Sequence, residues 1–152
     1  MDTVKIGIIG IGNMGSGHAN CIHGGEVEGL TLTAVADIDE NRLKWAEERF
    51  PEVARYATAE EMIDSADIDA VIIAVPHYFH PVYAIRAFKK GLHVMCEKPA
   101  GVFTKAVREM NGEAEKSGLV FGMMFNQRTN SVYKKMREIV QSGDLGEIKR
   151  TN

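Results

Sequence analysis

The chain of 152 residues is long enough for one domain with a hydrophobic core, and its 45% hydrophobic and 26% charged residues are typical of an ordinary soluble globular protein. A net charge of -3, without long blocks of like charge, argues against non-specific nucleic-acid binding. No apolar run approaches the roughly 18–20 residues that span a bilayer, and the N-terminus lacks a signal-peptide layout, so we expect a cytoplasmic protein that does not bind membranes.

Short apolar runs and helical patterns alternate along the chain. Strands are predicted at 4–9, 30–36, 53–56, 70–75, 93–96 and 119–125, where apolar residues are bounded by turn residues. Helices are predicted at 13–23, 39–50, 58–65, 80–90, 104–117 and 131–142, where apolar residues recur at helical spacing between capping residues. This alternation predicts right-handed βαβ crossovers and an α/β fold with a doubly wound parallel sheet.

The first predicted strand runs into Gly10, Gly12 and Gly15, a G-x-G-x-x-G pattern at the start of a predicted helix. Gly10 allows a tight turn, Gly12 lets the backbone approach a phosphate, and Gly15 lets the helix pack closely on the strand. The N–H groups near Asn13 and Met14 would then point at the anion from a helix N-terminus. The pattern predicts a pyrophosphate site; the alternative is a glycine-rich turn without a ligand.

Asp37 ends the second predicted strand, 22 residues after Gly15. A carboxylate at this place can accept hydrogen bonds from the adenosine ribose hydroxyls and repels a 2′-phosphate, so it predicts NAD rather than NADP. The alternative is a turn or helix-capping aspartate. Asp39 suits that role better, because it directly precedes the next predicted helix.

Two further stretches follow predicted strands, and in open α/β sheets ligands bind beyond the carboxyl ends of the strands. Pro76 is expected to shape a turn beside the ribose and nicotinamide, with His80 nearby, although spacing alone also fits a loop or capping histidine. Lys98 lies in the run Glu97-Lys98-Pro99, where it could handle the hydroxyl proton during hydride transfer while Glu97 orients its ammonium. The alternative for this run is a solvated turn.

With these motifs the chain resembles the Gfo/Idh/MocA family of oxidoreductases, which includes inositol dehydrogenases and glucose–fructose oxidoreductase. The resemblance rests on Gly10 to Gly15, Asp37, Pro76 with His80, the run from 91 to 99, and the tail from 142 to 148. It implies an N-terminal NAD(P)-binding Rossmann domain, followed by an α/β domain with a large open sheet that walls the substrate site and usually forms the dimer interface. It also implies that Lys98 contacts substrate and cofactor, and that the peptide bond before Pro99 is cis.

From the resemblance we expect residues 1–125 to form the NAD(P)-binding Rossmann domain. Residues 126–152 are expected to form a linker, a helix and, at 146–152, the first strand of a truncated second α/β domain. In the helix, four apolar residues are expected to face inward, namely Val132, Met136, Ile139 and Val140. The family's second-domain Asp-x-x-His motif is missing, so the chain alone is expected to be inactive.

The leading hypothesis is the cofactor-binding portion of an NAD-dependent oxidoreductase, which transfers a hydride between nicotinamide and a sugar, polyol or related carbonyl or alcohol substrate. Lys98 is the expected catalytic residue, no metal site is expected, and a full-length protein is expected to form a homo-oligomer. The expected cofactor-binding residues are Gly10, Gly12, Asn13, Met14, Gly15, Asp37, Ile38, Ala74, Val75, Pro76, His80, Glu97, Lys98 and Asn126. The alternatives are a non-catalytic NAD(H)-binding module or sensor, and an interaction protein whose strand beyond Ser131 pairs with a partner chain.

Overall fold

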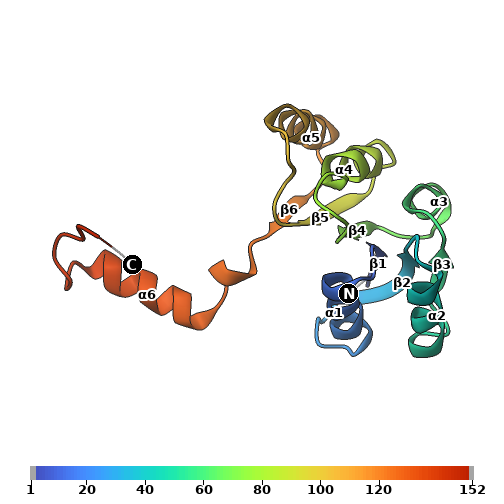
Figure 1. Cartoon of the computed structure of the whole chain (residues 1–152), viewed down its shortest axis with the longest axis horizontal. Coiled ribbons are helices and arrows are strands. Elements are labelled where there is room, and N and C mark those ends of the chain that lie inside the picture. The colour runs from blue at the N-terminus through green and yellow to red at the C-terminus, as the bar shows by residue number, and fades with distance from the viewer. Residues whose placement is uncertain (1–2, 151–152) are drawn as a thin grey trace.

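A computed structural model of the chain describes residues 3–150, and its centre is a six-stranded parallel sheet with helices on both faces (Figure 1). The strands are β1 (Val4–Ile9), β2 (Leu30–Ala36), β3 (Ala54–Tyr56), β4 (Ala70–Ile73), β5 (His93–Glu97) and β6 (Phe121–Met124). The helices are α1 (Asn13–His23), α2 (Glu40–Arg49), α3 (Ala59–Ser65), α4 (His80–Lys89), α5 (Thr104–Ser117) and α6 (Ser131–Ser142), and Asn126–Arg128 form a 3-10 helix, η1. The order β3-β2-β1-β4-β5-β6 confirms the predicted doubly wound fold.

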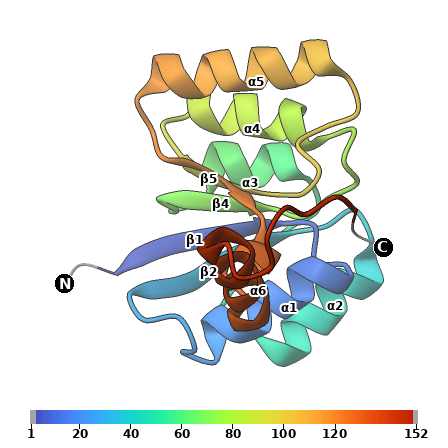
Figure 2. The same ribbon diagram turned by 90° about the vertical axis from the view of Figure 1, so that its left-hand side faces the viewer.

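The two faces of the sheet bury different side chains, because successive residues of a strand point to opposite faces. Figure 2 shows α3, α4 and α5 on one face and α1 and α2 on the other. Ile8 of β1 belongs to the core with Ala46 and Phe50, around α2. Ile9 faces the other side, in the core that includes Met62 of α3 and Met110 of α5. Burial on both faces explains why β1 reads as one continuous apolar run.

Side-chain caps mark the starts of three of the six described α-helices. The Asp39 carboxylate accepts a hydrogen bond from the Asn41 backbone N–H at the start of α2, which confirms its predicted role. The Thr58 hydroxyl likewise accepts from the Glu61 N–H at the start of α3. At α6 the cap is the side chain of Asn130, which accepts from the Val132 N–H.

The segment after β6 differs from the expectation. Helix α6 extends away from the sheet (Figure 1), and none of its residues is buried. The four apolar residues expected to face inward are half exposed, namely Val132, Met136, Ile139 and Val140 at 63%, 55%, 39% and 50%. No strand forms at 146–150, and the rest of that expected strand, 151–152, lies outside the described residues. The pattern identified an amphipathic helix correctly, but not a surface for it to cover.

Within residues 3–150, none of the helices combines the length and the apolar character that crossing a bilayer requires. Cys21 is partly buried and Cys96 is buried, and both are free thiols. Burial raises the pKa of Cys96 to about 12, so this thiol is not a nucleophile near neutral pH.

Candidate cofactor site

The predicted site lies at the point where the strand order reverses. β1 and β4 are neighbours in the sheet, so the turns that follow them diverge and leave a crevice beyond their carboxyl ends. A cleft of about 350 Å³ lies there. Seven of the predicted site residues line it, namely Gly10, Gly12, Asp37, Ile38, Ala74, Val75 and Pro76. The fold thus brings the ends of β1, β2 and β4 to one cleft.

Glycine is present at the three positions of the loop for different structural reasons. Gly10 has a φ of +84°, and a Cβ there would lie 2.9 Å from the Ala74 carbonyl oxygen. Gly15 is tighter still, since its Cβ would lie 1.8 Å from the Gly10 carbonyl oxygen. A Cβ on Gly12 would meet no heavy atom of the described residues within 4 Å beyond its own neighbours. The fold therefore requires glycine at positions 10 and 15, whereas position 12 faces open space.

Helix α1 starts directly from this loop. Gly12 is its N-cap, and within the described residues neither a side-chain cap nor an acidic residue in the first turn neutralises the helix end. The first-turn N–H groups of a helix have no partner within the helix, and the helix dipole makes this end positive. Asn13 and Met14 are exposed at this end. The arrangement suits an anion bound at the loop.

Asp37 holds the end of β2 against the glycine loop. One carboxylate oxygen accepts from the Ile11 backbone N–H at 2.8 Å, and the other accepts from the Asp39 N–H at 2.9 Å. Each carboxylate oxygen can accept more than one hydrogen bond, so the side chain retains capacity for a ligand hydroxyl. Ile38 follows with 89% of its side chain exposed.

Lys98 lies in a second hollow, of about 380 Å³, that is lined by Pro99, Asn126 and neighbouring residues of the turn after β6. The side chain of Lys98 is exposed, and the peptide bond to Pro99 is cis, as the resemblance implied. Asn126 begins η1 and is exposed at this hollow, apart from the glycine loop. The two hollows are thus lined by nine of the predicted residues. Five others line neither hollow, namely Asn13, Met14, Gly15, His80 and Glu97.

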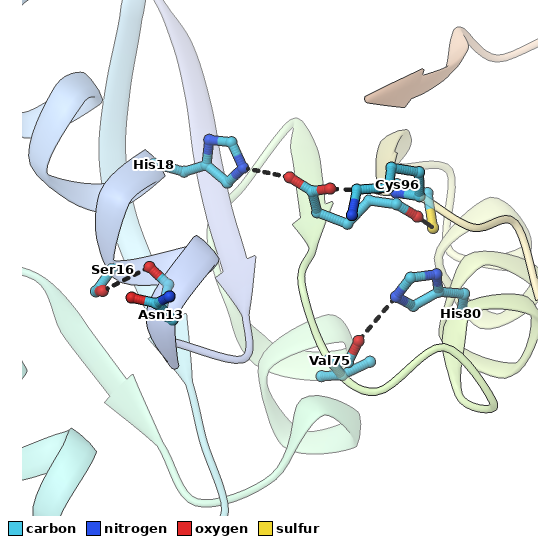
Figure 3. A network of polar contacts seen from close by, with 8 residues as sticks. Asn13, Ser16, His18, Val75, His80 and Cys96 are labelled. Atoms are coloured by element: carbon cyan, nitrogen blue, oxygen red, sulfur yellow. Dashed lines mark hydrogen bonds and ion pairs between the residues drawn. The ribbon is translucent and has the colours of Figure 1, made fainter. Parts of the chain in front are cut away.

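Glu97 is buried, and its contacts differ from the expectation (Figure 3). One carboxylate oxygen lies 2.9 Å from His18 Nε2, and the other accepts from the Lys98 backbone N–H at 3.2 Å. The carboxylate is therefore bound to a histidine and to a backbone amide, rather than to the Lys98 ammonium. A carboxyl group this well buried needs such hydrogen-bond partners.

His18 is the residue that sequence reasoning missed. It lies on α1, one helical turn beyond Gly15, and is 79 positions away from Glu97 in the chain. A single histidine on a helix gives no functional signal. The contact depends on the packing of α1 beside the end of β5, which no local pattern encodes.

His80 is 1% exposed, so its side chain lies beneath the site. Its Nε2 is 2.8 Å from the Val75 carbonyl oxygen (Figure 3). Its Nδ1 is 2.7 Å from the Pro99 carbonyl oxygen. Both ring nitrogens are thus occupied by the protein itself. Among the described residues, no three His, Cys, Asp or Glu side chains converge in a way that could hold a metal ion.

Comparison with known proteins agrees with this geometry. Residues 4–125 match the Gfo/Idh/MocA model, described as an oxidoreductase family with an NAD-binding Rossmann fold. Myo-inositol 2-dehydrogenase of Thermotoga maritima is 30% identical over 144 residues, which cover 95% of this chain and 42% of that protein.

Two solved structures share the fold closely. Myo-inositol 2-dehydrogenase from Lactobacillus plantarum has a TM-score of 0.91 at 34% identity, over 97% of this chain and 43% of that one. Scyllo-inositol dehydrogenase from Lactobacillus casei, solved with bound NAD(H) and scyllo-inositol, has a TM-score of 0.90 at 30% identity, over 97% of this chain and 43% of that one. The chain spans less than half the length of these relatives. Because the family model covers most of its residues, the chain belongs to the Gfo/Idh/MocA oxidoreductases through its NAD-binding Rossmann domain.

Proposed function

We propose that the chain binds NAD(H) in the cleft beyond β1, β2 and β4, and provides the nucleotide-binding part of a polyol dehydrogenase. The observation that carries this proposal is the open space at Gly12 beside the uncapped start of α1. A pyrophosphate there would receive N–H groups of the first turn, around Asn13 and Met14. Asp37 would accept the adenosine ribose hydroxyls, and the exposed Ile38 would give the adenine an apolar surface.

The nicotinamide end is assigned to the other side of the cleft. Ala74, Val75 and Pro76 line that side, in the turn that follows β4. A nicotinamide held there would supply the acceptor or donor of the hydride. Lys98 is exposed in the adjacent hollow, where its Nζ would hydrogen-bond the reacting oxygen of the substrate and hold or release the proton.

The proposed substrate class is a polyol. This proposal rests on the relatives, which are named as inositol dehydrogenases, and on the structure of one of them with scyllo-inositol. The chain spans less than half of their length, so we assign substrate binding mainly to a second domain of the kind that the family carries.

We also propose that the nucleotide domain ends near Phe125 and that α6 belongs to a second domain. The family match ends at Phe125, and α6 buries none of its residues. Limited proteolysis is expected to cut first within 126–130 and to leave a resistant fragment of residues before 126. First cuts inside the sheet, before Phe125, would contradict this division.

The cofactor preference tests the proposed function. In calorimetric titrations we expect NAD to bind more tightly than NADP by at least about tenfold, or ~1.4 kcal/mol, because the Asp37 carboxylate repels a 2′-phosphate. Asp37→Asn removes the charge but keeps an oxygen that can accept from the Ile11 N–H. This substitution should weaken NAD binding and reduce the difference between the affinities for NAD and NADP.

Asp39→Asn is the matched control for this measurement. Asp39 caps α2, and asparagine caps a helix about as well as aspartate, so the ratio should not change. Equal affinities of the unmodified chain for NAD and NADP would contradict the role assigned to Asp37. Absence of binding to either dinucleotide would contradict the proposed function itself.

A further inference from the structure

The His80 ring joins the two turns that border the nicotinamide side of the site. One of its contacts is the carbonyl of Val75, in the turn after β4 (Figure 3). The other is the carbonyl of Pro99, next to Lys98. These turns follow neighbouring strands, β4 and β5, but the chain between the two carbonyls contains the whole of α4. His80 is therefore the direct polar link between the cleft wall and the turn that carries Lys98.

The two contacts differ according to which nitrogen of the His80 ring carries a proton. A carbonyl oxygen only accepts hydrogen bonds, so each contact is a hydrogen bond only if the ring nitrogen carries a proton. A neutral imidazole has one N–H, and the tautomer decides which of the two carbonyls receives it. In either tautomer the buried ring lies between the two carbonyls and fixes how far apart the two turns are.

Glu97 is the buried acid on the same side of the site, and it has partners of its own. Its carboxylate is bound to His18 and to the Lys98 N–H. The contacts of the His80 ring are therefore the two carbonyls, one on each turn.

We propose that His80 is a positioning residue whose ring bridges the two turns and sets the place of Lys98 relative to the nicotinamide side of the cleft. With both nitrogens directed at the protein and the ring buried, His80 acts through the two turns and not by touching the ligand. This inference rests on the proposed function, because it assumes that the nicotinamide lies against Val75 and Pro76.

The first test concerns the ring itself and uses the unmodified chain. Nitrogen-edited NMR of the histidine side chains should show a His80 ring N–H that exchanges slowly with solvent, because it is buried and donates to a carbonyl. A His80 ring N–H that exchanges as fast as those of the exposed histidines would overturn the bridging assignment. This measurement does not depend on how any variant folds.

The second test separates positioning from general support of the fold. ADP-ribose contains the pyrophosphate and the adenosine of NADH but lacks the nicotinamide, so the ratio of the two affinities isolates the nicotinamide side. In the unmodified chain NADH should bind more tightly than ADP-ribose by about tenfold. His80→Gln cannot reach both carbonyls, and it should remove most of this ratio while ADP-ribose affinity stays within about twofold.

His23→Gln is the control, because His23 pairs with Glu52 on the surface, away from the cleft lining. It should leave both affinities unchanged. An equal loss of NADH and ADP-ribose binding in His80→Gln would show a purely structural role and overturn the proposal, as would an unchanged ratio. If the unmodified chain bound neither ligand, the proposed function would fail, while the NMR result would still decide whether the ring is held between the two turns.

Discussion

Replacing Gly12 with alanine is expected to weaken NAD binding by at least about a hundredfold, or ~2.7 kcal/mol, without loss of folding stability. The new methyl group would point into the space left open beside the start of α1, where the protein itself offers no contact. It would therefore meet the pyrophosphate and not the fold. Calorimetry with NAD measures the loss of affinity, and urea unfolding measures the stability.

Gly15→Ala is the informative contrast in the same loop. Its Cβ would lie 1.8 Å from the Gly10 carbonyl oxygen, so the first turn of α1 must move away from β1. We expect a loss of about 4 kcal/mol or more of unfolding free energy, at the upper end of single substitutions. Gly17→Ala is the control, because this exposed position in α1 has room for a Cβ and should gain slightly in helix stability.

Unchanged NAD affinity in Gly12→Ala would contradict the first prediction. It would mean that the phosphate site lies elsewhere.

The sequence predicted those parts of the site that depend on short-range order. The roles of Gly10 and Gly15 follow from the passage of a strand through a tight turn into a helix, which occupies a few consecutive residues. Asp39 could likewise be separated from Asp37 by helix-capping rules, and the structure shows Asp39 as the cap of α2. The hydrogen bond from the Ile11 N–H to Asp37 was not foreseen, because it requires the register of β1 against β2.

The parts that the sequence did not predict depend on contacts between distant elements. Glu97 was expected to hold the Lys98 ammonium, but the packing of α1 brings His18 to its carboxylate instead. His80 was expected at the cofactor wall, and only the folded chain shows both of its nitrogens on carbonyl oxygens. The stripe on α6 is a similar case, because amphipathic spacing reveals an apolar side without revealing what covers it.

If Lys98 exchanges a proton with the substrate, its removal should cause a large loss of turnover. In a protein that joins this domain to a substrate domain of the family's kind, Lys98→Ala is expected to lower kcat by about 10²–10⁴-fold, the range typical of a lost general acid or base. The affinity for NAD should stay within a few-fold, because Lys98 lies in a different hollow from the glycine loop. Steady-state kinetics on a polyol such as scyllo-inositol, together with NAD titration, measures the two quantities separately.

Two further variants distinguish proton transfer from simple attraction by charge. Lys98→Arg retains a positive charge but gives up a proton far less readily, so it should remain slow if Nζ exchanges a proton with the substrate. Lys105→Ala, on the exposed first turn of α5, removes a lysine outside both hollows and should leave kcat unchanged. If Lys98→Arg recovered most of the turnover, the role of Lys98 would be electrostatic stabilisation of the substrate and not proton transfer. Turnover in Lys98→Ala within about twofold of the unmodified protein would remove Lys98 from the mechanism, because a lost acid or base costs far more.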